Sequence, residues 1–243
     1  MRRFGLIGKS LSHSFSPDYF STKFEKEGIT DAEYVTCELN EISDFQSLKD
    51  QDFIGWNVTV PYKEAILPYL DELDEDARAI GAVNTIVKRG KTLKGFNTDH
   101  IGFERSLLPF LEPSDQKALI LGTGGASKAV AYALKRRGIN YAFVSRNPQA
   151  GQLSYDQLTG SVMPYVQMII NTTPIGMYPN ADAHPPVPFE LIESTHFLVD
   201  LIYNPEATIF LQVGMAHGSR TLNGLSMLHH QADESWRIWN EGK

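Results

Sequence analysis

The sequence predicts an α/β protein with two domains, each built on a mainly parallel sheet. Short apolar runs that suit buried strands alternate with stretches of helical periodicity along the whole chain of 243 residues. A break rich in turn residues at Glu112–Asp115 then separates these units into two series. Since a domain averages roughly 100–200 residues, this length leaves room for one large domain or two small ones, and the break favours two.

In the first series, glycine and proline mark the ends of the strands, and capping residues mark the helices. Ser16 is the expected N-cap of the first helix, Pro17 its first residue and Gly28 its C-terminal cap. The expected strands are Phe4–Ile7, Glu33–Leu39, Gly55–Val60 and a hairpin of Val83–Lys88 with Thr92–Phe96. The other expected helices are Lys63–Leu70, Glu72–Ile80 and Thr98–Leu111.

The second series repeats the alternation after the break. Its expected strands are Lys117–Leu121, Asn140–Ser145, Met168–Asn171 and Phe197–Leu201. Its expected helices are Gly125–Arg137, a helix from Pro205 to about His217, and Leu225–Trp239. The proline-rich segment Pro179–Pro188 is expected to be a loop. Ligands of such sheets bind beyond the carboxyl ends of the strands, so the residues there are the candidates for function.

Composition and charge exclude several classes of protein. Hydrophobic residues make up 42% of the chain and charged residues 21%, which is typical of a folded domain. A net charge of −7 without a run of Lys or Arg makes nucleic acid and anionic membranes poor candidates for partners. With Cys37 alone and scattered histidines, we expect no disulfide and no metal site. The start lacks the apolar core of a signal peptide and no run could span a bilayer, so a cytoplasmic protein is expected.

A glycine-rich loop lies between an apolar strand and a helix in the second series. Its residues are Gly122, Thr123, Gly124, Gly125 and Ala126. Glycines let the backbone approach a pyrophosphate, and a helix N-terminus offers it free N–H groups and a positive dipole. Such a loop alone can be a simple turn, but the flanking strand and helix favour a dinucleotide site.

The end of the next strand bears on which dinucleotide would bind. Ser145, Arg146 and Asn147 stand where NAD-binding folds carry an acid for the ribose hydroxyl. A guanidinium suits a 2′-phosphate in charge and in bidentate geometry, which favours NADP(H) over NAD(H). The alternative is a solvated surface arginine.

Four motifs at strand ends or helix starts carry most of the polar candidates of the first series. They are Ser12–Pro17, Asn57–Lys63, Gly81–Thr85 and Gly95–Asp99. They supply neutral hydrogen-bonding groups and one ionisable pair: Ser14, Ser16, Thr59, Asn84 and Asn97, with Lys63 and Asp99. This inventory suits a small, polyhydroxylated, anionic ligand. Singly, each could be a cap, a turn residue or a surface ion pair, but their joint position at strand ends favours a site.

In this order, the motifs resemble the shikimate dehydrogenase family over nearly the whole chain. The resemblance extends through the glycine loop and Asn171–Met177 to Asp200–Pro205, Asn223–Leu228 and the pair Gln231 and Ala232. It implies reversible reduction of 3-dehydroshikimate to shikimate by NADPH, with Lys63 as acid/base paired with Asp99. It also implies a substrate-binding and catalytic domain of residues 1–100 plus 222–243, a Rossmann NADP-binding domain of residues 101–221, and a cleft between them.

The resemblance implies further roles residue by residue. Ser14 and Ser16 would hold the substrate carboxylate, whereas Thr59, Asn84, Asp99, Tyr203 and Gln231 would surround the ring hydroxyls. The cofactor would meet residues 122–126, the Ser145–Asn147 turn, Thr172, Thr173, Leu201, Gly224 and, more loosely, Glu75. The partners implied are small molecules, in a monomer or a homodimer.

Two departures from the family pattern leave alternatives open. Ser145-Arg146-Asn147 replaces a common Asn-Arg-Thr, and the segment after it is too short for the family's usual helix and strand, so we expect a loop around 148–160. The alternatives are an NAD-using quinate/shikimate dehydrogenase, a non-catalytic NADP-binding regulatory module, and an α/β protein that binds an unrelated small acid. The two serines favour shikimate over quinate, and the Lys63–Asp99 pair argues against a loss of catalysis.

Overall fold

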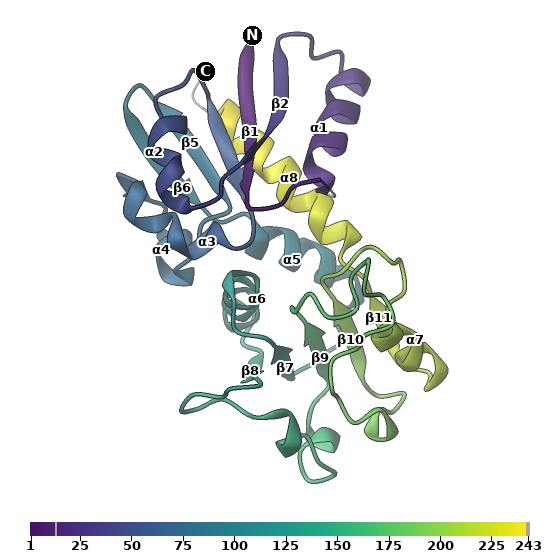
Figure 1. The fold of residues 1–243 in the computed structure, drawn as a ribbon. Helices are drawn as coiled ribbons and strands as arrows, with labels where there is room; N and C mark the ends of the chain where they lie inside the picture. The colour runs from purple at the N-terminus through teal and green to yellow at the C-terminus, as the bar shows by residue number, and fades with distance from the viewer. Residues whose placement is uncertain (13, 242–243) are drawn as a thin grey trace. The chain divides into compact units, whose positions relative to one another are not determined.

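A computed structural model describes residues 1–12 and 14–241 (Figure 1). The chain divides into two compact units. Unit 1 comprises Met1–Asp99 and Gln231–Lys243, and unit 2 comprises His100–His230. The chain returns to unit 1 inside the last helix, α8 (Leu225–Asn240), rather than at residue 222.

Unit 1 is built on a six-stranded sheet with the strand order β2-β1-β3-β5-β6-β4. Its strands are β1 (Arg2–Gly8), β2 (Ala32–Glu38), β3 (Gly55–Val58), β4 (Glu72–Leu73), β5 (Thr85–Arg89) and β6 (Thr92–Phe96). β5 runs antiparallel to both of its neighbours, and the other pairs are parallel. The mainly parallel sheet and the β5–β6 hairpin confirm the prediction.

Helices cover both faces of this sheet (Figure 1). They are α1 (Phe15–Lys26), α2 (Phe45–Leu48), α3 (Tyr62–Ala65) and α4 (Glu75–Ile80), with the unit 1 part of α8. Side chains three apart on a strand point to opposite faces. Phe4 therefore packs with Phe20 and Trp239 under α1 and α8, whereas Ile7 packs with Phe45 on the other face.

Unit 2 is built on five parallel strands in the order β11-β10-β9-β7-β8. They are β7 (Lys117–Leu121), β8 (Asn140–Val144), β9 (Met168–Asn171), β10 (Phe197–Asp200) and β11 (Arg220–Leu222). Four of them confirm predicted strands to within one residue. β11 was not predicted, because three half-buried residues carry no clear apolar pattern.

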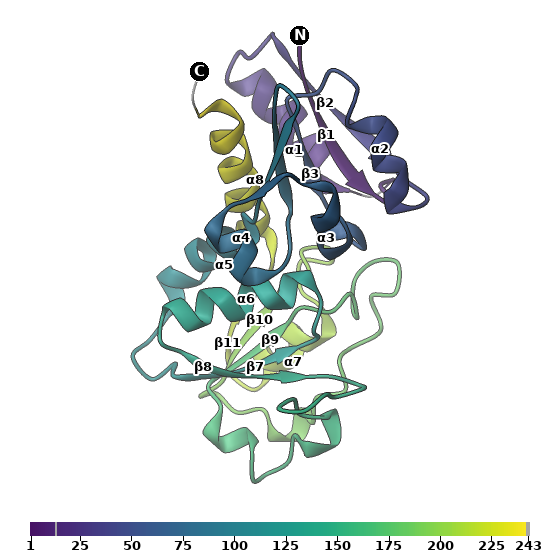
Figure 2. The same cartoon turned by 90° about the vertical axis from the view of Figure 1, so that its left-hand side faces the viewer.

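Helices cover the sheet of unit 2 (Figure 2), and a hydrophobic core packs against each face. Its helices are α5 (Asp99–Leu107), α6 (Gly125–Arg136) and α7 (Ile209–Ala216), with the start of α8. Along β7, Ala118 and Ile120 pack in the cluster with α5 and α6, whereas Leu119 and Leu121 pack in the cluster with α7. Between β8 and β9 the structure has 3₁₀ turns and a parallel bridge from Val144 to Leu153, with no helix longer than a turn.

Four predicted helix boundaries were wrong. The N-cap of α1 is Ser14 rather than Ser16, so Pro17 lies inside the first turn, where its missing N–H costs no hydrogen bond. The stretch from Glu72 is first a strand, because Leu73 pairs with Gly95, and α4 begins only after the Asp74 cap.

The other two boundaries follow from similar causes. The predicted helix from Lys63 ends as α3 at Ala65 and continues as a 3₁₀ turn around Pro68. α7 begins at Ile209 instead of Pro205, because Thr208 caps it with a hydroxyl that accepts from the Leu211 N–H. Among residues 1–12 and 14–241, no helix has both the length and the hydropathy to cross a bilayer.

Candidate active site

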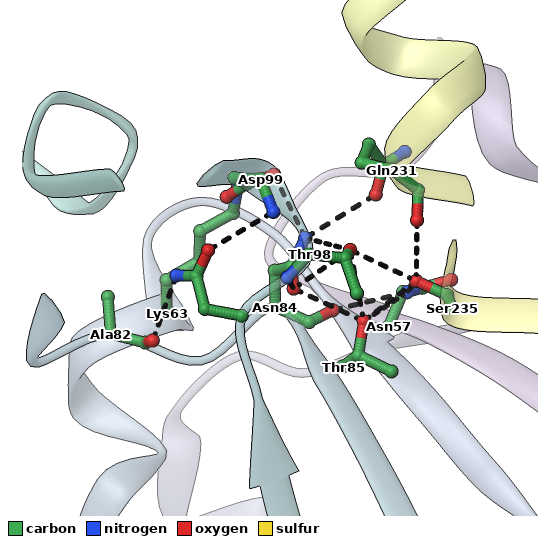
Figure 3. Close-up of polar contacts among 10 residues, drawn as sticks. Asn57, Lys63, Ala82, Asn84, Thr85, Thr98, Asp99, Gln231 and Ser235 are labelled. Carbon is green, nitrogen blue, oxygen red and sulfur yellow. Dashed lines mark hydrogen bonds and ion pairs between the residues drawn. The ribbon is translucent and has the colours of Figure 1, made fainter. Parts of the chain in front are cut away.

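The topology of unit 1 brings three predicted residues to one edge of its sheet. Lys63 lies in α3, just after β3, and Asp99 is the first residue of α5, just after β6. Asn84 immediately precedes β5, which runs the opposite way, so the start of β5 lies at the same edge as the ends of β3 and β6. These three side chains come from separate segments and converge there (Figure 3).

Lys63 and Asp99 form a short ion pair. The Lys63 Nζ donates to Asp99 Oδ2 at 2.7 Å, and the side chains are 17% and 6% exposed. The other carboxylate oxygen, Oδ1, accepts from Asn84 Nδ2 at 2.9 Å. The carboxylate therefore has a partner on each oxygen, and low exposure limits its screening by solvent.

Asn84 is held from several directions. Its Oδ1 accepts from the backbone N–H of Thr98 at 2.7 Å, and its Nδ2 donates to Thr98 Oγ1 at 2.9 Å. Gln231 Oε1 lies 3.4 Å from the same Nδ2. An amide nitrogen has two hydrogens, and Asp99 and Thr98 are nearer acceptors, so the Gln231 contact is the weakest of the three.

Asn97 has a structural role within this group. Its Nδ2 donates to the Ala82 carbonyl at 2.9 Å, and its Oδ1 accepts from the backbone N–H of Asp99 at 3.1 Å. With its side chain 2% exposed, Asn97 fixes the backbone that presents Asp99.

The predicted carboxylate-binding serines lie at the start of α1. Ser14 is the N-cap, yet its side chain makes no capping hydrogen bond, and Ser16 is half-buried in the first turn. Burial raises the pKa of the Tyr34 hydroxyl, and a hydrogen bond from the Ser16 side chain opposes that rise. His13, within the same motif, lies outside the described residues.

Thr59 follows β3 in a turn toward Lys63. Its N–H donates to the Ile7 carbonyl at 2.8 Å, and its carbonyl accepts from the Tyr62 N–H at 2.9 Å. The backbone of Thr59 is thus tied to β1 and α3, and its side chain is half-buried.

Glu75 and Tyr203 each belong to a different unit from most of the residues with which they were grouped. Glu75 is exposed in the first turn of α4 in unit 1, although it was grouped with cofactor residues that lie in unit 2. Tyr203 follows β10 in unit 2, and burial raises the pKa of its hydroxyl.

The glycine loop of unit 2 has the geometry that the sequence predicts. Gly122 follows β7 with a φ of 107°, a conformation that side chains disfavour. A Cβ there would lie 3.0 Å from Thr172 Oγ1, whereas a Cβ on Gly124 would meet no atom within 4 Å. Gly124 is the N-cap of α6, and Thr123 and Gly124 are exposed. An open backbone before the N-terminus of α6 fits a pyrophosphate.

Neighbouring segments are tied to this loop by hydrogen bonds. Thr172 Oγ1 donates to the Leu121 carbonyl at 2.6 Å and lies 2.6 Å from Ser127 Oγ in the first turn of α6. Thr173 Oγ1 donates to Asn171 Oδ1 at 2.7 Å. The Thr172 hydroxyl therefore lies beside the glycine loop, and the Thr173 hydroxyl lies in the turn that follows β9.

A second close approach of backbone occurs at Gly224, before α8. A Cβ on Gly224 would overlap the carbonyl of Leu201, and the Gly224 N–H donates to the Ile202 carbonyl at 3.0 Å. Only glycine lets these two segments meet, so the predicted cofactor residues Leu201 and Gly224 lie side by side.

The turn after β8 is exposed. The Asn147 N–H donates to Ser145 Oγ at 3.2 Å, and this hydrogen bond closes the turn. Arg146 is exposed between these two residues. Burial raises the pKa of the Tyr155 hydroxyl, and the positive charge of Arg146 opposes that rise. The guanidinium therefore lies within electrostatic reach of Tyr155.

Asp200 is a buried carboxylate that the sequence did not single out by function. Its oxygens accept from Thr208 Oγ1 at 2.7 Å, from Asn171 Nδ2 at 3.0 Å and from the Ile202 N–H at 3.0 Å. Burial raises its pKa to about 6, against the opposing effect of these donors. Asp200 thereby joins the turn after β9 to the turn after β10.

Sequence reasoning also missed polar residues packed behind Asn84: Asn57, Thr85, Thr98 and Ser235. An amide inside the buried strand Gly55–Val58 was one available signal, since such a group needs partners. Ser235 lies one helical turn after Gln231, which was another signal. In the part of the chain that the structure describes, no three His, Cys, Asp or Glu side chains gather as a metal site would require.

Comparison with known proteins places this geometry in a family. The shikimate dehydrogenase (NADP(+)) of Caldicellulosiruptor saccharolyticus is 40% identical, over 98% of this chain and 92% of the relative. The chain belongs to the shikimate dehydrogenase family. Residues 6–86 also match the family model for the shikimate dehydrogenase substrate binding domain.

Solved structures agree with this assignment. A shikimate dehydrogenase from Peptoclostridium difficile has a TM-score of 0.89 at 38% identity, covering 100% of this chain and 93% of that one. The Thermus thermophilus enzyme in complex with NADP(H) and shikimate has a TM-score of 0.87 at 32% identity, covering 99% and 94%. The two α/β units and their sheets are therefore those of the family.

Proposed function

We propose that this protein catalyses the reversible reduction of 3-dehydroshikimate to shikimate with NADPH. The observation that carries the proposal is the Lys63–Asp99 pair, whose second carboxylate oxygen is held by Asn84. The solved relative that binds NADP(H) and shikimate supports both ligands. The cytoplasmic location and the choice between monomer and homodimer remain predictions from the sequence.

The substrate groups in this proposal are those of the sequence prediction. Ser14 and Ser16 at the start of α1 donate hydroxyl hydrogens to the carboxylate. Thr59, Asn84, Asp99, Tyr203 and Gln231 bind the ring hydroxyls. The long 3.4 Å contact of Gln231 with Asn84 leaves the Gln231 amide ready to exchange that partner for a ligand hydroxyl.

Lys63 is the proposed acid/base. Reduction of the carbonyl places negative charge on its oxygen, and the Lys63 ammonium stabilises that charge and then donates a proton to it. In the reverse direction the neutral amine takes the proton from the substrate hydroxyl. The Asp99 carboxylate orients the ammonium by its 2.7 Å hydrogen bond.

Unit 2 would hold the cofactor. Residues 122–126 and the N-terminus of α6 meet the pyrophosphate, and Ser145, Arg146 and Asn147 meet the 2′-phosphate. Thr172, Thr173, Leu201 and Gly224 line the neighbouring turns, and Glu75 is a further contact proposed from the resemblance alone. The chemistry that NADPH supplies is hydride transfer.

An absorbance assay of shikimate oxidation tests the proposal. We expect turnover with NADP⁺, and we expect Lys63→Ala to lower kcat by about a hundred-fold or more, with a smaller change in substrate KM. The matched control is Lys91→Ala, which removes an exposed lysine of the β5–β6 hairpin. Near-normal kcat in Lys63→Ala would contradict the role of Lys63. Quinate with NAD⁺ as the better pair, or NADPH binding without turnover, would favour the alternatives.

A further inference from the structure

Beneath the candidate site, unit 1 contains a buried group of polar side chains. Asn57 from β3, Thr85 from β5, Thr98 before α5 and Ser235 from α8 are each at most 6% exposed (Figure 3). Burial of a polar group costs free energy unless the group is hydrogen-bonded. Four such residues from four segments therefore require a connected network, and the distances show one.

Ser235 is the centre of this network. Its Oγ donates to the Gln231 carbonyl at 2.9 Å, receives a hydrogen bond from Asn57 Nδ2 at 3.0 Å and lies 2.8 Å from Thr85 Oγ1. A hydroxyl has one hydrogen and two lone pairs, so donation to Gln231 leaves Ser235 only as an acceptor toward its other neighbours. This one oxygen thus joins β3 and β5 to α8.

The network continues from Ser235 to Asn84. The one hydroxyl hydrogen of Thr85 is shared between Ser235 Oγ at 2.8 Å and Asn84 Oδ1 at 3.2 Å, and Thr98 Oγ1 lies 3.2 Å from Ser235 Oγ. Thr98 in turn receives a hydrogen bond from Asn84 Nδ2 at 2.9 Å and donates its N–H to Asn84 Oδ1 at 2.7 Å. Ser235 therefore supports both residues that flank the Asn84 amide.

The orientation of the Asn84 amide decides its contact with Asp99. In the observed orientation, Nδ2 donates to Asp99 Oδ1. Rotating the amide by half a turn would place its NH₂ against the Thr98 N–H and its oxygen against the Asp99 carboxylate. Both contacts would be repulsive, so the groups that hold Asn84 also hold the carboxylate that pairs with Lys63.

The position of Ser235 is itself constrained by α8. Trp239, one turn further along, donates its indole N–H to the Ile86 carbonyl at 3.0 Å. Gln231, Ser235 and Trp239 are spaced four apart and so lie along one face of the helix. β5 thus anchors the same face that presents Ser235.

We propose that Ser235 is a positioning residue, which acts through Thr85, Thr98 and Asn84 to hold the Asp99 carboxylate against Lys63. The proposal rests on the proposed function for its kinetic readout but not for its spectroscopic one. Loss of the hydroxyl removes a shared acceptor of the neighbouring side chains, so that Thr85 and Thr98 reorient and the Asn84 amide is displaced relative to the Asp99 carboxylate.

The kinetic test compares two buried serines. Ser235→Ala is expected to lower kcat about ten-fold, the scale of one hydrogen bond, with little change in the KM of NADP⁺. Ser106→Ala is the control, because Ser106 is 3% exposed and its Oγ donates to the Phe103 carbonyl within its own helix at 2.8 Å. We expect Ser106→Ala to keep kcat within about two-fold while losing a similar hydrogen bond.

A double-mutant cycle separates positioning from simple structural support. In an Asp99→Asn background, Ser235→Ala should lower kcat no further, because its effect passes through the Asp99 carboxylate. Full additivity of the two losses, or a kcat for Ser235→Ala equal to that of Ser106→Ala, would overturn the proposal.

Nuclear magnetic resonance supplies the readout that does not depend on activity. The side-chain NH₂ signals of Asn84, assigned by their loss in Asn84→Asp, should shift or broaden in Ser235→Ala and stay in place in Ser106→Ala. Unchanged Asn84 signals in Ser235→Ala would overturn the proposal even if the wild-type protein had no activity on shikimate. Absence of wild-type turnover, with these signals shifted, would instead overturn the proposed function alone.

Discussion

In unit 1 the candidate groups are buried side chains that hold one another, whereas in unit 2 they are backbone groups and exposed side chains around a glycine loop. Asn84 and Asp99 are buried, and each makes hydrogen bonds to other site residues. Thr123, Gly124 and Arg146 are exposed. The first arrangement is suited to hold a proton donor at a defined position, and the second to receive the phosphates of a larger ligand.

The difference has a physical origin. Side chains in a buried network lose orientational freedom during folding, so the protein meets that cost before a ligand binds. A glycine loop has few side chains to order, and it recognises phosphate through N–H groups that the helix leaves unpaired. Substitutions in unit 1 should therefore act mainly on kcat, and those in unit 2 on stability and cofactor affinity.

The largest expected effect is at Asp99. Asp99→Asn keeps the size of the side chain and an oxygen for Asn84, but it removes the charged partner of Lys63. We expect kcat to fall by about a hundred-fold, because an acid/base group that is no longer oriented loses most of its contribution. Steady-state assays of shikimate oxidation measure this.

The control for Asp99 is a second Lys–Asp pair in unit 1. Lys23 Nζ lies 2.9 Å from Asp233 Oδ1, where the aspartate side chain is 47% exposed. Asp233→Asn should leave kcat nearly unchanged, because exposed ion pairs contribute little. Equal kcat losses in the two variants would contradict the assignment of Asp99.

In unit 2 the largest expected effect is on stability, at Gly224. A methyl group in Gly224→Ala would overlap the Leu201 carbonyl, which is backbone and cannot move without displacing the end of β10. We expect the free energy of unfolding to fall by about 1–3 kcal/mol, as in overpacked cores. Urea unfolding checks this against Gly160→Ala, where an added Cβ meets no atom within 4 Å. If both variants unfold at the same urea concentration, the close approach of Gly224 to Leu201 does not make the added methyl group destabilising.

Asp200 makes the stability of unit 2 depend on pH. Its folded pKa of about 6 exceeds the ordinary value of 3.8, so the folded protein holds the proton more tightly than the unfolded chain does. The contribution of Asp200 to stability is therefore greatest below about pH 4 and is lost as the pH rises through 6. At about 1.36 kcal/mol per pKa unit, the loss is on the order of 3 kcal/mol.

Asp200→Asn should remove this dependence. Its oxygen can still accept from Asn171 and Ile202, and the Thr208 hydroxyl can turn to accept from the new NH₂ group. Urea unfolding between pH 4 and pH 7 should show the wild type losing stability relative to the variant. Asp156→Asn, at an exposed carboxylate, should keep the wild-type slope. If the free energy of unfolding has the same pH dependence in the wild type and in Asp200→Asn, Asp200 is ionised over this whole pH range in the folded protein.

Features set by local pattern were predictable from the sequence. The apolar run Lys117–Leu121 and the glycines after it suffice for a strand and a tight turn, because both depend on neighbouring residues. The residues Lys63, Asn84 and Asp99 were candidates because each stands at the end of a strand or the start of the next element. Their convergence depends on the strand order, which only the structure supplies.

Features that depend on distant residues were not predictable in this way. Asn57 and Ser235 are 178 positions apart and meet only after α8 packs on unit 1. β4 is a strand because Leu73 pairs with Gly95, against the helical pattern of its own segment. α7 begins at Ile209 and not at the predicted Pro205, because Thr208 is its N-cap. Thr208 is held by a hydrogen bond to the buried Asp200, and the local sequence around Pro205 does not indicate that contact.

A cofactor-specific kinetic effect is expected at Arg146, and it tests whether the exposed turn of unit 2 selects the cofactor. Arg146→Ala removes a guanidinium that can form charge-assisted hydrogen bonds to a 2′-phosphate, each worth about 1.5–3 kcal/mol. We expect kcat/KM for NADP⁺ to fall by about ten-fold to a hundred-fold while that for NAD⁺, which lacks the phosphate, changes little. Arg78→Ala, at another exposed arginine, controls for the loss of charge. Because Arg146 is exposed, added salt should weaken NADP⁺ binding in the wild type more than in Arg146→Ala. An unchanged ratio of NADP⁺ to NAD⁺ use would mean that the cofactor is selected elsewhere in unit 2, and that this turn is only a solvated end of β8.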